Sequence, residues 1–264
     1  MVNSFDIASI NYDATFTHSN IGILQRNYVY EHFKKTLSTT PSIKNILEIN
    51  CGTGEDAIWL TKQGYNVLAT DISEKMVETA SKKETNLEGS LKFEQADINK
   101  LNSQYKNKKF DLVFSNFGGL NCLDENNLKG FLKNIPELLS KNGKVVMVIM
   151  PRKCIWERIY FILKGNFKKA FRRNSKEASI ADVDGEKVPT WYYNPKDIIN
   201  LLNQNFIVEM KKPIGFFVPP SYLEPFFKKN KKLLSFFNYM DNKIKHFGFL
   251  SSYSDHYLIS IKLK

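Results

Sequence analysis

The sequence predicts an α/β fold with a mostly parallel central sheet, and three observations carry that prediction. An apolar strand that begins at Ile46 runs into a turn containing Gly52 and Gly54, and an amphipathic helix follows. A second short apolar strand, 66–70, ends on Asp71. Further apolar strands alternate with helical segments through the first half of the chain. Glycines that let the backbone approach a ligand, with an acid at the next strand end, indicate a nucleotide site at the carboxyl edge of the sheet.

The remaining elements follow in order along the chain. Expected after Asp71 are strands 90–94, 110–115 and 144–150, with a helix at about 125–139 before the last of them, then a helix from 194 to 202 and strands 206–211 and 255–263. Two helical insertions, 152–189 and 215–254, interrupt this ending. We therefore divide the chain into an N-terminal arm (1–40), a ligand-binding core (41–150) and a cap with the last strands (151–264).

The charges around the glycine turn favour a nucleotide without phosphate. The dinucleotide pattern G-x-G-x-x-G is incomplete, because only Gly52 and Gly54 are present. Glu55 and Asp56 place negative charge at the start of the next helix, where a pyrophosphate would otherwise bind. Glu48 adds another carboxylate before the turn. A ligand with an amino group and a sulfonium fits this charge better than a phosphorylated coenzyme.

Glu48 to Gly54 resemble the first motif, E/D-x-G-x-G-x-G, of the class I S-adenosylmethionine-dependent methyltransferases. Asn50 replaces the first glycine, and asparagine is the non-glycine residue that best tolerates positive φ. The resemblance continues along about two thirds of the chain. It implies a seven-stranded Rossmann-like sheet with helices on both faces. It also implies S-adenosyl-L-methionine as the cofactor and S-adenosyl-L-homocysteine as its product.

The same resemblance implies a set of cofactor contacts. Asp71 matches the acid that holds the ribose, Asp97 the acid that meets the adenine amino group, and Asn116 the loop near the transferred methyl. The arm is similar to the segment that closes the site in small-molecule methyltransferases of the ubiquinone and menaquinone biosynthesis type, where Arg26 would hold the methionine carboxylate. The predicted cofactor-binding residues are Tyr12, Arg26, Glu48, Asn50, Cys51, Gly52, Gly54, Asp71, Ile72, Met76, Ala96, Asp97, Ile98, Ser115 and Asn116.

Several of these residues also have an ordinary structural interpretation. Asp97 could cap a helix, and Met76 could belong to the core. Tyr12 and Phe16, four residues apart, could be simple helix packing. Asn116 could lie in a loop without ligand contact. The order and spacing of all the pieces together favour the cofactor site.

Composition limits the other function classes. With 264 residues, 42% of them hydrophobic, the chain can bury one core with appendages. No stretch approaches about 18 consecutive apolar residues, and no basic-then-apolar leader opens the chain, so we expect a cytoplasmic protein. Cys51, Cys122 and Cys154 are widely spaced without metal-type clustering, so no metal site is expected.

Charge is placed unevenly along the chain. Residues 1–150 carry 17 Lys+Arg and 17 Asp+Glu, whereas residues 151–264 carry 21 and 10 and hold 21 of the 35 aromatic residues. The cap could close an aromatic pocket over a sulfonium, rest on an anionic membrane through 152–173 and 226–247, bind nucleic-acid phosphates, or present its cations to solvent. The loop at 116–120 lacks the N/D-P-P-Y/F sequence of base amino methylation, and we identify no duplex-binding module, which disfavours nucleic acid.

The expected chemistry is methyl transfer, an SN2 displacement on a sulfonium that alignment in a dry pocket can largely catalyse. A hydroxyl acceptor would also need a general base, and histidine suits that role near neutral pH. His18 in the arm and His256 beside Asp255 are the candidates. We therefore expect O-, N- or C-methylation of a small or lipophilic acceptor. The alternatives are a nucleic-acid methyltransferase and a catalytically silent S-adenosylmethionine-binding assembly factor.

Overall fold

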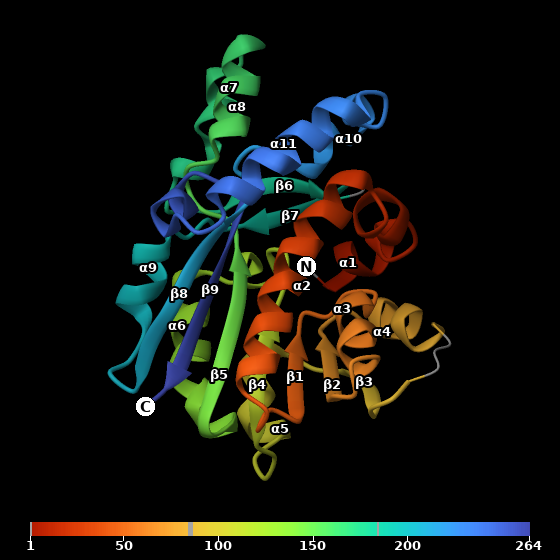
Figure 1. Cartoon of the computed structure of the whole chain (residues 1–264), viewed down its shortest axis with the longest axis vertical. Coiled ribbons are helices and arrows are strands. Elements are labelled where there is room, and N and C mark those ends of the chain that lie inside the picture. Colours follow the sequence, from red (N-terminus) through yellow and green to blue (C-terminus); the bar gives the residue numbers. More distant parts are fainter. Residues whose placement is uncertain (1, 84–86, 184) are drawn as a thin grey trace.

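A computed structural model describes residues 2–83, 87–183 and 185–264, and one seven-stranded sheet organises them (Figure 1). The strands, in spatial order, are β3 (Leu91–Gln95), β2 (Asn66–Asp71), β1 (Asn45–Ile49), β4 (Phe110–Ser115), β5 (Leu139–Ile149), β9 (His256–Leu263) and β8 (Phe206–Ile214). The first five are parallel, and β9 runs antiparallel to both β5 and β8. The order reverses beside β1, and ligands bind at such a switch point. The predicted fold class is confirmed.

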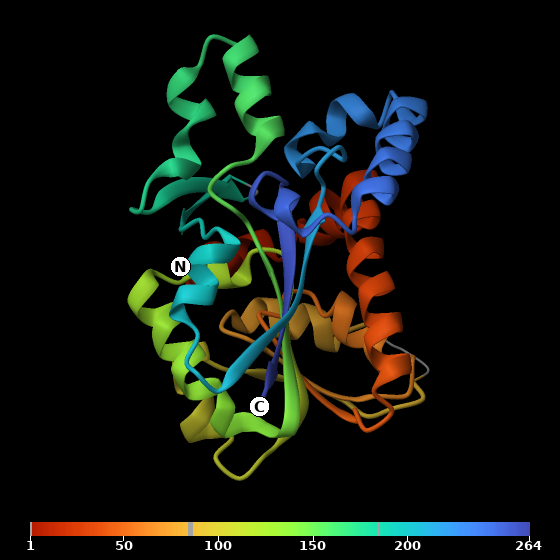
Figure 2. The same ribbon diagram turned by 60° about the vertical axis from the view of Figure 1, so that its left-hand side comes forward.

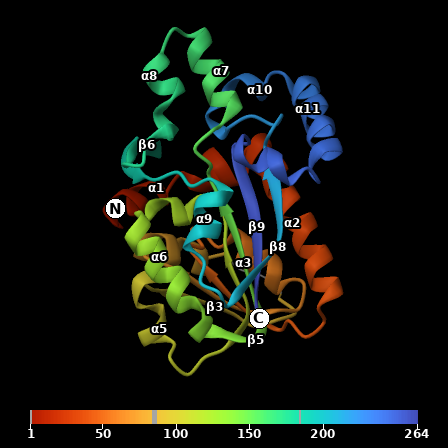
Figure 3. The same ribbon diagram turned by 90° about the vertical axis from the view of Figure 1, so that its left-hand side faces the viewer.

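Helices cover both faces of this sheet (Figures 2 and 3). They are α1 (Val2–Ala8), the π-helical turn η1 (Asp13–Thr17) and α2 (Asn20–Thr39) in the arm, then α3 (Glu55–Thr61), α4 (Glu74–Ser81), η2 (Ile98–Lys100), α5 (Leu101–Gln104), η3 (Gly119–Cys122), α6 (Glu125–Asn134), η4 (Ile135–Leu138) and α9 (Pro195–Leu201). Phe33 of α2 and Leu60 of α3 join one apolar cluster, whereas Leu128 of α6 and Ile198 of α9 join another. Strands covered on both faces are expected to read as continuous apolar runs, which explains the strength of the sequence signal.

Two element boundaries differ from the prediction by five residues, more than the others. Helix α6 ends at Asn134, and residues 135–138 form the short helical turn η4, so the helix expected to reach about 139 was too long. Pro136 lies at the start of η4, and proline has no N–H with which to continue the α-helical ladder. As a result β5 begins at Leu139, ahead of the predicted start at Lys144.

The first insertion contains a hairpin that the prediction of a helical insertion missed. It consists of α7 (Ile155–Leu163), α8 (Phe167–Ala170), η5 (Arg172–Asn174) and the antiparallel pair β6 (Ser179–Val183) and β7 (Glu186–Thr190). Gly185 adopts φ +88°, and its N–H donates to Asp182 Oδ1 over 2.9 Å. An Asp-Gly pair between alternating residues is a hairpin signal, so 184–185 is the pattern that could have revealed it.

The second insertion is helical, as predicted, and it joins the arm above the carboxyl edge of the sheet. Its elements are η6 (Ser221–Leu223), α10 (Glu224–Phe227), α11 (Lys231–Ile244) and η7 (Gly248–Ser252). The Glu224 carboxylate accepts the N–H groups of Asn20 and Ile21, over 3.1 and 2.9 Å, at the start of α2. A carboxylate at a helix N-terminus satisfies free donors and the dipole together. Among the described residues, none of the helices combines the length and apolar character needed to span a bilayer.

Asp241 of α11 fixes the start of this insertion, and its titration gives a first prediction. Its carboxylate accepts the N–H groups of Phe217 and Val218 over 2.8 and 2.9 Å. Burial raises the pKa of Asp241 to about 6, although these hydrogen bonds oppose the rise. The folded chain therefore keeps this proton to higher pH than the unfolded chain, so this group's contribution to stability falls as pH rises from 3.8 to about 6.

We expect Asp241→Asn to remove that fall, which amounts to roughly 2–3 kcal/mol of unfolding free energy. Urea unfolding of both proteins at a series of pH values measures the difference. An identical pH profile in the asparagine variant would contradict the assignment.

Candidate functional site

The turn after β1 is built from left-handed residues. Asn50, Gly52 and Gly54 have φ of 57°, 53° and 79°. A Cβ on Gly54 would lie 2.7 Å from the Phe93 ring, whereas a Cβ on Gly52 would meet only the Tyr12 ring, at 3.9 Å. Gly54 therefore packs inward, and Gly52 faces open space. Asn50 adopts the positive φ that asparagine was expected to tolerate at this position.

Asp71 ties the end of β2 to this turn. Its Oδ2 accepts the N–H of Gly52 over 2.8 Å, and its Oδ1 accepts the N–H of Ser73 over 3.0 Å. Burial raises the pKa of Asp71, while the backbone donors act against that rise. Each carboxylate oxygen can accept a further hydrogen bond, and Asp71 also lines the cavity described next.

A cavity of about 540 Å³ lies at the carboxyl edge of the sheet, which is within the usual range for small-molecule sites. The predicted cofactor residues that line it are Tyr12, Asn50, Gly52, Asp71, Ile72, Met76, Ala96, Asp97, Ile98 and Asn116. The cap contributes Arg172, Arg173, Ala181, Thr190, Trp191, Tyr192, Tyr222 and His256. Asp97 also caps η2, where its Oδ1 accepts the N–H of Asn99 over 2.9 Å. One cavity therefore joins the core to the cap.

A small adjoining cavity of about 30 Å³ contains Arg26 and Cys51 in its lining and shares Tyr12 and Gly52 with the large one. Arg26 Nε lies 3.1 Å from Asp56 Oδ1, and the guanidinium lies over a neighbouring phenyl ring. Arg26 Nη1 is buried without a hydrogen-bond partner among the described residues. A carboxylate in this cavity would satisfy that donor, so the site fits the amino-acid end of S-adenosylmethionine.

Three predicted contact residues lie behind the turn and not in either cavity. Glu48 is buried, and burial followed by the neighbouring Asp56 raises its pKa well above the usual value. Gly54 packs on Phe93, and Ser115 Oγ donates to Asn50 Oδ1 over 3.4 Å. These three residues support the turn and line neither cavity, so their contact with the cofactor stays a prediction.

The arm packs over the turn after β1 and over the start of α4, and two side-chain hydrogen bonds hold it there. Asp6 accepts the hydroxyl of Ser73, and Asp13 accepts the hydroxyl of Thr53, each over 2.5 Å. Tyr12 lies between these two carboxylates in the sequence and is half-buried at the cavity, and desolvation of its hydroxyl raises its pKa. Its ring centroid lies 5.7 Å from that of Phe16, so the packing contact and the cavity contact occur together.

The two candidate histidines have different environments. The His18 side chain is 62% exposed, pairs with Glu55 at 4.0 Å and is not among the residues that line either cavity, so the expectation that it faces the cleft is corrected. His256 does line the large cavity, and its Nδ1 lies 3.1 Å from Asp255 Oδ2. Burial alone would raise the pKa of Asp255, but His256 and Arg173 outweigh it and hold that pKa well below its usual range. Because Nδ1 faces a carboxylate, a base at this position would use Nε2 to accept a proton.

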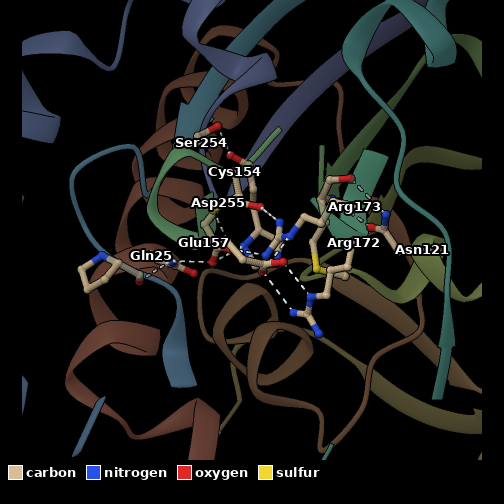
Figure 4. A network of polar contacts seen from close by, with 11 residues as sticks. Gln25, Asn121, Cys154, Glu157, Arg172, Arg173, Ser254 and Asp255 are labelled. Atoms are coloured by element: carbon tan, nitrogen blue, oxygen red, sulfur yellow. Dashed lines mark hydrogen bonds and ion pairs between the residues drawn. The ribbon is translucent and has the colours of Figure 1, made fainter. Parts of the chain in front are cut away.

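A buried ionic network locks the first insertion to the last strand (Figure 4). Arg173 Nε donates to Glu157 and its Nη2 donates to Asp255, each over 3.0 Å. Arg172 donates to the same Glu157 over 2.6 and 3.1 Å. Gln25 of α2 donates to Asp255 over 3.2 Å, so the arm joins the network. Both arginines also line the cavity, which fixes that wall in place.

The sequence analysis missed Asn121, Arg173 and Trp191. Asn121 Oδ1 accepts the N–H of Met150 over 2.9 Å, and its Nδ2 donates to the Trp191 carbonyl over 2.6 Å. This side chain therefore ties the loop after β4 to the cap. Arg173 belonged to a basic run that reads equally well as a solvated face, so the sequence offered no specific signal for its burial.

Comparison with known proteins agrees with this geometry. A methyltransferase domain family model matches residues 46–143. An uncharacterized protein of Methanocaldococcus jannaschii is 28% identical over 92% of this chain and 90% of its own length. The demethylmenaquinone methyltransferase of Lactobacillus johnsonii is 34% identical over 48% of this chain and 54% of its own length. The solved structure of an S-adenosylmethionine-dependent methyltransferase from Clostridium acetobutylicum superposes with a TM-score of 0.60 at 17% identity, covering 97% of each chain.

Proposed function

We propose that this chain, a class I S-adenosylmethionine-dependent methyltransferase, methylates a small and largely apolar acceptor held between the glycine turn and the cap. The observation that carries the proposal is the single cavity that joins the turn at Gly52 to Trp191, Tyr192 and Tyr222 of the cap. Aromatic walls suit a flat, weakly polar acceptor, and they also attract a cationic sulfonium. The relative named as a demethylmenaquinone methyltransferase supports a quinone-like or phenolic ring.

The cofactor would lie along the edge from β1 to β3. We assign Asp71 to the ribose hydroxyls, Ile72 and Met76 to the faces of the adenine, and Asp97 to its amino group. Arg26, with its unpaired Nη1, is assigned to the carboxylate. When bound, S-adenosylmethionine supplies an activated methyl group that leaves sulfur in one displacement.

The chain's own residues would align the two reactants and exclude water. The arm and cap cover the cavity, and a dry, aligned site supplies much of the rate of such a displacement. For a hydroxyl acceptor, His256 Nε2 would take the proton as the new C–O bond forms, while Asp255 holds the imidazole through Nδ1. An acceptor that is methylated on nitrogen or carbon would depend less on proton removal by His256.

The acceptor class can be tested with the purified full-length chain, methyl-labelled S-adenosylmethionine and a total cell extract. The label should enter organic-extractable small molecules or lipids. Label in the nucleic-acid fraction would overturn the proposal. Cofactor binding without any transfer would instead identify a silent S-adenosylmethionine-binding factor.

Asp71 gives the test of the cofactor assignment. Asp71→Ala should weaken S-adenosylmethionine binding by about 1–3 kcal/mol, because a buried acceptor for the ribose is lost. Calorimetric titration measures the affinity. Glu74→Ala removes an exposed carboxylate on the neighbouring helix and should leave affinity unchanged. Equal affinities for the Asp71 variant and the unmodified chain would remove the ribose role.

A further inference from the structure

The two cap insertions end in exposed apolar corners that the proposed function does not use. The corner between α7 and α8 carries Ile162, Leu163 and Phe167, which are 41%, 82% and 62% exposed. The corner between α10 and α11 carries Phe226 and Leu233, which are 55% and 40% exposed. We call these five side chains the cap tips. Clustered exposed apolar side chains of this size mark a contact surface.

Lysines surround both corners. They are Lys164, Lys168 and Lys169 at the first corner and Lys228, Lys229, Lys231 and Lys232 at the second. Within the described part of the chain, no carboxylate lies at ion-pair distance from any of the seven. The sequence has no acidic residue between Glu157 and Glu177 or between Glu224 and Asp241. Each corner therefore carries exposed apolar side chains next to several lysines that have no acidic residue between them in the sequence.

The two corners form one face of the molecule. Figures 2 and 3 show α7 with α8 and α10 with α11 projecting side by side from the same end, away from the chain's C-terminus. Trp156 of α7 contacts Phe237 of α11 with ring centroids 5.4 Å apart, and Phe161 stacks on Tyr222 at 6.1 Å. Tyr222 also lines the large cavity. The helices that carry the two corners are thus in contact with the same part of the cap, and α7 also contacts the wall of the site.

We propose that the cap tips dock this enzyme on an anionic lipid bilayer, with the five apolar side chains in the interface and the seven lysines at the headgroups. Positive charge around exposed leucine and phenylalanine is the combination that peripheral membrane helices use. Phosphates of a nucleic acid would engage the lysines but would leave Leu163 and Phe167 in water. The inference rests on the proposed function in one respect, which is that a lipophilic acceptor would reach the cavity from the bilayer.

The test is co-sedimentation of the full-length chain, without cofactor, with vesicles of phosphatidylcholine alone and of phosphatidylcholine mixed with phosphatidylglycerol. The chain should bind the mixed vesicles and bind the neutral ones weakly. Leu163→Ser with Phe167→Ser should lower binding to mixed vesicles about tenfold or more, because both side chains leave the interface. Lys168→Gln with Lys169→Gln should lower it about fivefold per lysine, and added salt should do the same.

Matched controls lie at the opposite end of the molecule. Ile207 is an exposed apolar residue paired with Lys262 near the C-terminus, and Ile207→Ser should leave vesicle binding unchanged. Lys106→Gln with Lys141→Gln removes two exposed charges at that end. This variant should bind mixed vesicles almost as well as the unmodified chain, since it changes only the net charge. Failure to bind mixed vesicles, or equal losses in tip and control variants, would overturn the proposal.

Two further measurements distinguish membrane docking from nucleic-acid binding and from a role of the cap tips in methyl transfer. Binding to RNA that is strong and insensitive to the Leu163→Ser, Phe167→Ser change would assign the lysines to nucleic acid and overturn membrane docking. Methyl transfer to a water-soluble acceptor without vesicles should be equal in the tip variants and the unmodified chain. A loss there would show that the tips serve the site itself, so failure of docking and failure of the proposed function give different results.

Discussion

Replacing His256 by glutamine should lower the rate of methyl transfer to a hydroxyl acceptor by about 10²–10⁴-fold while leaving cofactor affinity nearly unchanged. Glutamine fills a similar space beside Asp255 but cannot take the hydroxyl proton. His256 lines the cavity and contacts the Phe117 ring edge-on, with centroids 5.5 Å apart, but we assign it no contact with the cofactor. Single-turnover transfer from labelled S-adenosylmethionine measures the rate, and calorimetric titration measures the affinity.

His18 provides the matched control for this prediction. It is the other histidine that the sequence offered, but its side chain is exposed and pairs with Glu55 outside the cavity. His18→Gln should therefore retain the rate of the unmodified chain. A full rate in the His256 variant would show that alignment alone drives the transfer. Equal losses in both variants would indicate a general effect on the fold.

The core could be predicted from the sequence because its signals are local. Strands buried on both faces read as apolar runs, and the turn needs Gly54 where a Cβ would strike Phe93. Strand β2 ends on Asp71, as expected, and β9 begins at His256, one residue after the predicted start. The positive φ of Asn50 could be predicted for the same reason, since a positive φ restricts the residue types that a position tolerates.

The cap could not be predicted to the same depth, because contacts between residues far apart in the sequence decide it. Arg173 meets Asp255 across 82 positions, and nothing in the basic run around Arg173 distinguishes a buried arginine from a solvated one. The same limit applies to the histidines, since only the packing of the arm against β9 decides which one lines the cavity. It also applies to Glu48, which was predicted to contact the cofactor but is buried and lines neither cavity.

The buried network gives the largest expected change in stability. Arg173 is buried between Glu157 and Asp255, and Arg173→Met would leave two carboxylates with less compensation. Arg172 still pairs with Glu157, and Gln25 with His256 still face Asp255. Breaking a buried pair by removing one partner typically costs about 3–5 kcal/mol, so we expect a loss of that order in urea unfolding at neutral pH.

Arg158, which follows Glu157 in α7, supplies the comparison for this loss. Its guanidinium donates to Asn174 in an exposed hydrogen bond, so Arg158→Met should cost about 0.5 kcal/mol. The loss of unfolding free energy at acidic pH provides a second test. The pKa of Asp255 is depressed below 3.8, so its contribution to stability is present above that pH and is lost as pH falls further. Without Arg173 this depression should shrink, so the Arg173→Met variant should lose less stability on acidification than the unmodified chain. Two results would show that Arg173 does not hold Asp255 in its ionised form. One is an equal loss of stability on acidification in Arg173→Met and the unmodified chain. The other is a similar loss of stability at neutral pH in Arg173→Met and Arg158→Met.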